Sequence, residues 1–304
     1  MSSTVLNVSR LYKSYGQQQV LKELSFSVEQ GQIVAMLGRN GAGKTTTIRS
    51  LMGLIEPDSG EIDVLGFSPL EQPLEIRKRI GYLAEDQQMY GWMTVLETIQ
   101  FVSAFYEQWD HKLVQSLLEQ FELPPGAKVK SLSKGQNVRL GLLLALAHHP
   151  QMVILDDPVL GLDPIMRKEF NRDLITHLQA ENCTVLYSSH LLYEVEPIAD
   201  VVMILHEGCI LRQASTEELK ADVKRVIFSS GIAPLGIHQM RVIDAQQRSH
   251  HLALTVENFQ ETETELDQRG ISYEVQDLNL DEIFEAYIIG DPKLPFNHQE
   301  PVEV

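Results

Sequence analysis

The segment that most limits how this chain can fold is a glycine-rich run of eight residues, Gly38-Arg39-Asn40-Gly41-Ala42-Gly43-Lys44-Thr45. It follows a short apolar stretch, Ile33–Leu37, and precedes a helix-like stretch from Thr45 to Met52. Glycines here let the backbone curl around an anion with its N–H groups pointing inward, and the start of the helix adds partial positive charge. The run and its position predict a phosphate-binding loop.

Three side chains in this loop have expected roles. We expect Lys44 to reach the β- and γ-phosphates, Thr45 to offer its hydroxyl to Mg²⁺, and Thr46 to hydrogen-bond near the α-phosphate. The backbone of the other loop residues is expected to cradle the phosphates: Gly38, Arg39, Asn40, Gly41, Ala42 and Gly43. The alternative is a chance glycine turn with a surface lysine, which the flanking strand and helix disfavour.

Two carboxylates end a second apolar strand. Met152–Leu155 runs directly into Asp156 and Asp157, so both acids are expected at the carboxyl edge of the sheet, where open α/β sheets bind ligands. Asp156 is expected to hold Mg²⁺, directly or through water, and Asp157 to orient an attacking water. Taken alone, Asp-Asp-Pro is more often a helix cap or a turn; the buried strand before it favours the site.

Apolar strands alternating with helical patterns predict an α/β fold with a mostly parallel sheet and an inserted helical layer. Thr94–Glu122 has helical spacing, Pro124-Pro125-Gly126 interrupts it, and a second amphipathic helix is expected from about Gln136 to Ala147. The expected strands are 6–8, 24–28, 33–37, 80–83, 152–155, 185–188, 201–206 and 209–213, with a hairpin turn at Glu207-Gly208.

The chain changes character near Ser215. Residues 216–304 hold 17 acidic and 7 basic residues, and their strand and helix patterns predict a small α+β domain. The predicted division is 1–215 for the nucleotide-binding domain, with its helical subdomain at about 90–150, then 216–292 for the acidic α+β domain and 293–304 for a disordered tail.

Composition excludes several classes of protein. The net charge of −17 disfavours a nucleic-acid-binding surface, which requires clustered Lys and Arg, so no nucleic-acid partner is expected. The longest apolar run, Leu140–Ala147, is far shorter than the roughly 20 residues that cross a bilayer, and no secretory signal is visible. Cys183 and Cys209 are expected to be reduced core thiols, which indicates a cytoplasmic protein.

Further motifs resemble those of one family, the ATP-binding subunits of ABC transporters. Leu132-Ser133-Lys134-Gly135-Gln136 is similar to the family's signature and lies in the expected place between the phosphate loop and the Asp156 strand. Gly161-Leu162-Asp163 is similar to the D-loop, and Ser188-Ser189-His190 to the switch histidine, which contacts the γ-phosphate. Tyr15 fits the aromatic position that stacks on adenine, although Tyr12 is close enough to leave that choice open.

The resemblance covers residues 4 to about 215, and it implies a P-loop NTPase core with an antiparallel β subdomain and an inserted helical subdomain. It also implies partners. Two copies of the chain, or the chain and a homologous subunit, would pair head to tail, with Ser133 and Gly135 of one covering the γ-phosphate held by Lys44 of the other. Gln136 and Asp163 are also expected to contact the nucleotide. A separate membrane permease would place the pair on the inner face of the cell membrane, with its short helix received near 87–93. ATP and Mg²⁺ are the implied ligands.

The chain departs from the family pattern at two positions. The usual Glu after the magnesium-binding Asp is replaced by Asp157, so we expect real but slow ATP hydrolysis. Where many members place a metal-contacting Gln, this chain has Glu85, which we expect to approach Mg²⁺, with Gln87 and Gln88 slightly beyond.

The resemblance implies an ATPase that drives transport. Export is expected because similar C-terminal domains, closing with a stretch like Leu280–Phe284, occur in bacterial exporters. Two alternatives remain open: an ATP-driven switch with little hydrolysis, which Asp157 makes plausible, and a non-transport ABC ATPase, which the net acidity disfavours.

Overall fold

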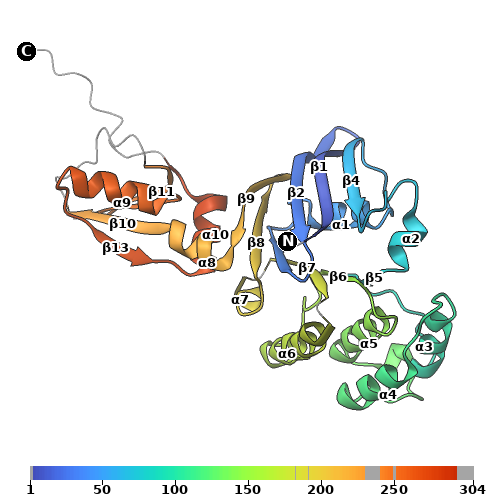
Figure 1. The fold of residues 1–304 in the computed structure, drawn as a ribbon. Coiled ribbons are helices and arrows are strands. Elements are labelled where there is room, and N and C mark those ends of the chain that lie inside the picture. The colour runs from blue at the N-terminus through green and yellow to red at the C-terminus, as the bar shows by residue number, and fades with distance from the viewer. Residues whose placement is uncertain (1–2, 182, 191, 230–239, 249–250, 293–304) are drawn as a thin grey trace, which may run out of the picture. The chain divides into compact units, whose positions relative to one another are not determined.

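The computed structural model describes residues 3–181, 183–190, 192–229, 240–248 and 251–292. The chain divides into two compact units, residues 1–213 and 214–304 (Figure 1).

A six-stranded sheet is the centre of the first unit. Its strand order is β5-β6-β7-β3-β8-β9, and the four pairings from β5 through β8 are parallel. The strands are β3 (Ile33–Leu37), β5 (Ile80–Leu83), β6 (Met152–Asp156), β7 (Thr184–Ser189), β8 (Val201–His206) and β9 (Cys209–Ser215). Glu207 and Gly208 both have positive φ, 46° and 85°, as a two-residue hairpin turn requires, so that prediction is confirmed.

A three-stranded antiparallel sheet packs on the phosphate-loop side of this sheet. It contains β1 (Thr4–Tyr15), β2 (Gln18–Glu29) and β4 (Ser59–Val64) in the order β2-β1-β4. One apolar cluster joins β1 and β2 to β3, β8 and helix α1 (Lys44–Leu51). The short helix α2 (Pro73–Arg77) follows β4. The two sheets and helix α1 thus share one apolar core.

The inserted helical layer is built from α3 (Val95–Ser103), α4 (His111–Gln120) and α5 (Lys134–Leu146), with a 3₁₀ turn η1 (Val129–Ser131) before α5 (Figure 1). The helix predicted from about Gln136 to Ala147 is confirmed as α5, which begins two residues earlier because Ser133 caps it. It is less amphipathic than predicted, because β5, α3 and α4 all pack against it and bury most of its circumference. Helices α6 (Pro164–Glu181) and α7 (Leu192–Val195) complete the unit.

The second unit is a four-stranded antiparallel sheet with the order β11-β12-β10-β13 and an apolar core under helix α9. Its elements are α8 (Thr216–Asp222), β10 (Lys224–Ser229), β11 (Val242–Arg248), β12 (His251–Val256), α9 (Phe259–Gln268), β13 (Glu274–Asp277) and α10 (Leu280–Ile289). The predicted tail, 293–304, lies outside the described residues. The α/β class and the mixed architecture predicted from the sequence are confirmed.

The two cysteines are free, as predicted. Cys183 is buried, whereas Cys209 is only partly buried because it begins the edge strand β9.

Candidate nucleotide-binding site

The glycine-rich loop connects β3 to the first turn of α1. Gly41 and Gly43 have φ of 83° and 113°, in the left-handed region that glycine tolerates best. Gly43 is the N-cap of α1 and has no side chain to bond the first N–H groups of the helix. These donors, together with the helix dipole, are therefore available to an anion.

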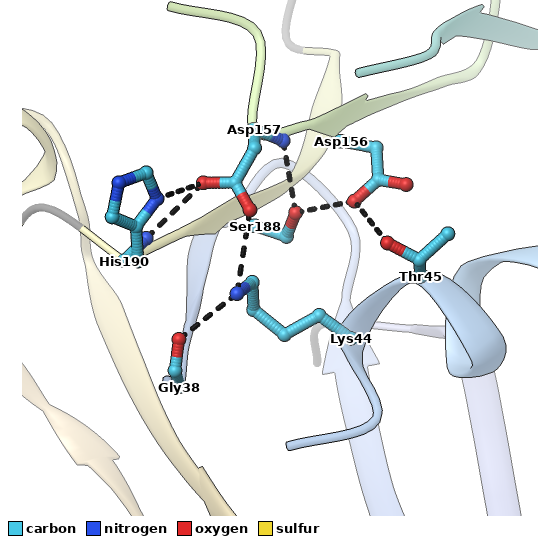
Figure 2. A network of polar contacts seen from close by, with 7 residues as sticks. All are labelled: Gly38, Lys44, Thr45, Asp156, Asp157, Ser188 and His190. Atoms are coloured by element: carbon cyan, nitrogen blue, oxygen red, sulfur yellow. Dashed lines mark hydrogen bonds and ion pairs between the residues drawn. The ribbon is translucent and has the colours of Figure 1, made fainter. Parts of the chain in front are cut away.

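Lys44 is anchored over this loop. Its Nζ donates a 2.9 Å hydrogen bond to the Gly38 carbonyl and lies 3.3 Å from Oδ2 of Asp157 (Figure 2). The two charged side chains are only 6% and 8% exposed, so water screens their attraction weakly. Sequence spacing alone did not indicate this ion pair.

Asp156 ends β6 and binds two hydroxyl groups through one oxygen. Its Oδ1 accepts hydrogen bonds from Ser188 Oγ at 2.8 Å and from Thr45 Oγ1 at 3.4 Å. Burial raises the pKa of this carboxyl, and the hydrogen bonds from Ser188 and Thr45 oppose the shift. Thr45 and Asp156 are thus brought together at the edge of the sheet as the sequence indicated.

Asp157 joins the phosphate loop to His190. The Asp157 Oδ1 atom accepts a hydrogen bond from the backbone N–H of His190 at 3.2 Å and lies 2.8 Å from His190 Nδ1. The backbone of Asp157 has φ of 42°, which is unusual for a residue other than glycine. The turn points its carboxylate back toward Lys44 and His190 (Figure 2).

Lys44, Thr45, Asp157 and His190 line one open cavity of about 420 Å³, whereas the buried Asp156 is not part of its lining. Its lining residues are Gln18, Val20, Arg39, Asn40, Gly41, Gly43, Lys44, Thr45, Thr46, Glu85, Asp157, Leu160 and His190. Gln18, Val20 and Leu160 were not expected from the sequence, because the β1–β2 hairpin and the loop after β6 reach the site only through tertiary packing. The cavity combines backbone donors, a lysine and carboxylates, which suits a polyphosphate with a cation.

The oxygen donors near this cavity fit Mg²⁺. Burial raises the pKa of Glu85, and the nearby charges of Asp157 and Asp156 raise it further. A divalent cation would relieve this crowding of negative charge. Within the described part of the chain, no group of three or more His, Cys, Asp or Glu is arranged to hold a metal. Mg²⁺ often takes one or two carboxylates plus substrate phosphates, which matches this set.

Gln87 is turned away from the cavity. Its side-chain oxygen is buried and accepts no hydrogen bond among the described residues, and it packs against Gly141 of α5, where a Cβ would lie 2.3 Å from it. Gln87 therefore contacts the helix that follows the signature.

The signature and D-loop residues lie outside this cavity. Ser133 and Gln136 form a reciprocal capping box at the start of α5, and Asp163 caps α6 by accepting hydrogen bonds from the N–H groups of residues 165 and 166. Gly135 packs against Met166. These four predicted nucleotide contacts are not brought to Lys44 within one subunit.

Tyr15 does not line the cavity either. It is 49% exposed at the end of β1, and Lys13 Nζ lies 5.6 Å from its ring centroid. Ala42 is buried beneath the loop, where it contributes to the core.

Known proteins resemble the chain across this whole region. A family model described as ABC transporter matches residues 21–160. The bacitracin transport ATP-binding protein BcrA of Bacillus licheniformis is 39% identical over 220 residues, which are 72% of each chain. The chain belongs to the ABC transporter ATP-binding proteins. An uncharacterized ABC transporter ATP-binding protein of Bacillus subtilis, YdbJ, is 31% identical and aligns over 92% of this chain and 91% of its own length.

A solved ATP-binding subunit of an ABC transporter has the same fold, with a TM-score of 0.66 and 29% identity over 72% of this chain and 92% of its own. As an ABC transporter ATP-binding subunit, the chain belongs to a family that binds ATP and couples its hydrolysis to transport. None of the helices described in the structure is both long and apolar enough to cross a membrane.

Proposed function

We propose that this subunit binds ATP with Mg²⁺ at a seam between two copies, hydrolyses it slowly and drives export through a separate membrane permease. The observation that carries the proposal is the gathering of Lys44, Asp157 and His190 around one cavity while Ser133 and Gly135 lie outside it. Such a cavity is half of a site, which a second copy can complete with its own signature. The alternative partner is a homologous subunit.

Six side chains in or beside the cavity have roles in phosphoryl transfer to water. Lys44 and the loop N–H groups bind the phosphate oxygens, and Asp157 orients the water that attacks the γ-phosphorus as the bond to the β–γ bridging oxygen breaks. His190 donates a hydrogen bond to the γ-phosphate. Thr45, Asp156 and Glu85 would hold Mg²⁺, which neutralises charge on the phosphates when bound.

Asp157 makes the reaction slow. Its carboxylate is one methylene shorter than that of Glu, roughly 1.5 Å, and a misplacement of about 1 Å can lower a rate about 10²-fold. In the described structure both of its oxygens already have partners, Lys44 and His190. The same feature favours the second candidate, a switch that closes on ATP and hardly cleaves it.

ATP acts as the link between the two copies. Its γ-phosphate would contact Lys44 of one copy and Ser133, Gly135 and Gln136 of the other only before cleavage, with Asp163 beside the seam. Hydrolysis removes these contacts and the pair opens, which is the mechanical output of the subunit.

An exposed aromatic cluster supports the permease partner. Tyr90, Trp92, Phe101 and Phe105 form a chain of rings with centroids 5.3 to 5.9 Å apart, and each is more than 40% exposed. Exposed aromatic clusters of this kind mark protein-binding surfaces. A short permease helix seated here would hold the subunit at the inner face of the membrane.

The C-terminal region supports export. We assign residues 1–215 to the nucleotide-binding domain and 216–292 to an acidic accessory domain, which closes with Leu280–Phe284 in the first turns of α10. Its resemblance to the C-terminal domains of exporter subunits is the basis for the direction of transport.

Phosphate release by the purified subunit, alone and with its permease, tests hydrolysis. We expect ATP-dependent release above that of Lys44→Ala and a moderate gain of rate in Asp157→Glu, because the longer side chain restores the usual reach of the carboxylate. A loss of rate in Asp157→Glu would show that the site is built around Asp. A large gain in Asp157→Glu would favour the switch. No release above background in any wild-type preparation would contradict the ATPase.

A further inference from the structure

Ser188 occupies the centre of the polar network and has no assigned role in the reaction. It lies in β7 directly beside Asp156 in the parallel register with β6, and it is completely buried. Its hydroxyl donates to Asp156 Oδ1 at 2.8 Å and accepts from the backbone N–H of Asp157 at 3.0 Å (Figure 2). One hydroxyl thus contacts both acids of the site.

The directions of these two hydrogen bonds are fixed by chemistry. The Asp157 N–H can only donate, and an ionised Asp156 can only accept, so the Ser188 proton must point to Asp156. The bond to Ser188 is shorter than the bond from Thr45 to the same oxygen, 2.8 against 3.4 Å. Ser188 is therefore the principal restraint on the rotation of this carboxylate.

The restraint leaves the other oxygen of Asp156 available. No hydrogen bond to Oδ2 occurs among the residues that the structure describes, and Figure 2 shows this oxygen pointing away from Ser188. An oriented carboxylate with one free oxygen is suited to hold a cation or a water bound to it.

Ser188 also supports the turn at Asp157. That residue has φ of 42°, and its N–H is shared between the Ser188 carbonyl at 3.1 Å and the Ser188 hydroxyl at 3.0 Å. An unusual backbone conformation persists where surrounding contacts hold it. Both contacts come from the same residue, and the hydroxyl supplies one of the two hydrogen bonds that hold the turn from which the Asp157 carboxylate projects to Lys44 and His190.

We propose that Ser188 is a positioning residue that orients Asp156 toward Mg²⁺ and fixes Asp157 for the attacking water. This inference rests on the proposed function, since it assigns Ser188 to the same reaction. Hydrogen-bond partners of metal ligands typically change metal affinity or activity by about 10- to 100-fold when they are removed.

The test compares Ser188→Ala with Ser188→Thr, which keeps the hydroxyl. Binding of a fluorescent ATP analogue is measured with and without Mg²⁺, and phosphate release is measured separately. In Ser188→Ala we expect Mg²⁺-free binding within about twofold of wild type, a Mg²⁺ requirement raised about tenfold and a rate lowered about 10- to 100-fold. Ser188→Thr should restore both Mg²⁺ dependence and rate.

Thr184→Val is the matched control. Thr184 is a completely buried residue at the opposite end of β7, where its hydroxyl accepts from the Gly31 N–H at 2.9 Å. Its loss should lower the thermal midpoint without changing Mg²⁺ dependence. If Ser188→Ala does not fold, Ser188→Cys, with its weaker donor, should show the same defect in Mg²⁺ dependence.

Three outcomes would overturn the proposal. The first is a wild-type Mg²⁺ requirement in Ser188→Ala, or in Ser188→Cys where the Ala variant does not fold. The second is a Mg²⁺ requirement raised equally in Thr184→Val, and the third is a failure of Ser188→Thr to restore the Mg²⁺ requirement and the rate.

Asp156→Asn distinguishes failure of this inference from failure of the proposed function. If Asp156→Asn loses Mg²⁺ dependence and Ser188→Ala keeps it, only the inference about Ser188 fails. If wild type binds the analogue without any effect of Mg²⁺, the magnesium site itself fails.

Discussion

The ammonium group of Lys44 lies 3.3 Å from the carboxylate of Asp157, and both side chains are more than nine-tenths buried. The lysine expected to bind phosphate is thus paired with the acid expected to orient water. Because the pair is poorly screened, the Asp157 carboxylate and an incoming γ-phosphate would compete for Lys44. We therefore expect nucleotide binding to weaken the Lys44–Asp157 ion pair.

Asp157→Asn should bind ATP several-fold more tightly while its hydrolysis falls about 100-fold. The substitution removes the negative charge that competes for Lys44 and repels the γ-phosphate, so ATP binds more tightly. It also removes a general base, and such a base typically raises a reaction rate roughly 10²- to 10⁴-fold. Titration with ATP and phosphate release measure the two effects. Asp86→Asn, a change at an exposed acid beside Glu85, is the control. An unchanged rate in Asp157→Asn would show that another group orients the water.

Gly135→Ala should fold but fail to dimerise with ATP. The new Cβ would lie 2.0 Å from the terminal methyl of Met166, which can move because it ends a flexible side chain. Sedimentation with ATP in the Asp157→Asn background measures the dimer, and we expect at least about tenfold weaker association, or about 1.4 kcal/mol. If Met166→Ala in the same chain restored the dimer, the defect would be steric and within one subunit.

Trp92→Ala with Phe101→Ala should release the subunit from the membrane. Truncation of aromatic residues at the centre of an interface often costs 2 kcal/mol or more, so association with the permease should weaken by more than about tenfold. The fraction of subunit in the membrane pellet of native cells measures this, with Leu74→Ala as an exposed apolar control outside the cluster. Phosphate release by the isolated double variant should equal that of wild type; unchanged membrane association would exclude the aromatic cluster as the docking surface.

Because of His148, the free energy of unfolding should fall in mild acid. Burial lowers the pKa of this imidazole to about 4, and its ring stacks on Tyr106 with centroids 4.1 Å apart. An unfolded histidine titrates near 6.5, so between about pH 4 and 6.5 the unfolded chain binds more protons and stability rises with pH. The full effect is on the order of 3 kcal/mol.

Urea unfolding across this pH window checks the prediction for His148. We expect His148→Phe, which keeps the stacked ring, to lose less stability in acid than wild type. His111→Gln, a change at an exposed position in α4, should follow the wild-type curve. Equal pH dependence in wild type and His148→Phe would refute the assignment.

Local sequence patterns predicted much of the fold. The strands Ile33–Leu37, Ile80–Leu83 and Val201–His206 have the predicted bounds, because continuous apolar runs bordered by polar residues mark buried parallel strands clearly. The half-exposed strands β1 and β2 are much longer than predicted, since their alternating polar residues weaken the apolar signal. Helix α8 was missed for a similar reason, because its short sequence buries little apolar surface.

The chain's own sequence determined the phosphate loop, the acids at the end of β6 and the order of the family motifs, because these depend on short-range spacing and backbone freedom. Tertiary structure alone decided that Lys44 pairs with Asp157, that Ser188 joins the two acids, and that Tyr15 lies outside the cavity. Such contacts join residues far apart in the chain. They depend on the strand order β6-β7-β3, which places three separate strand ends side by side.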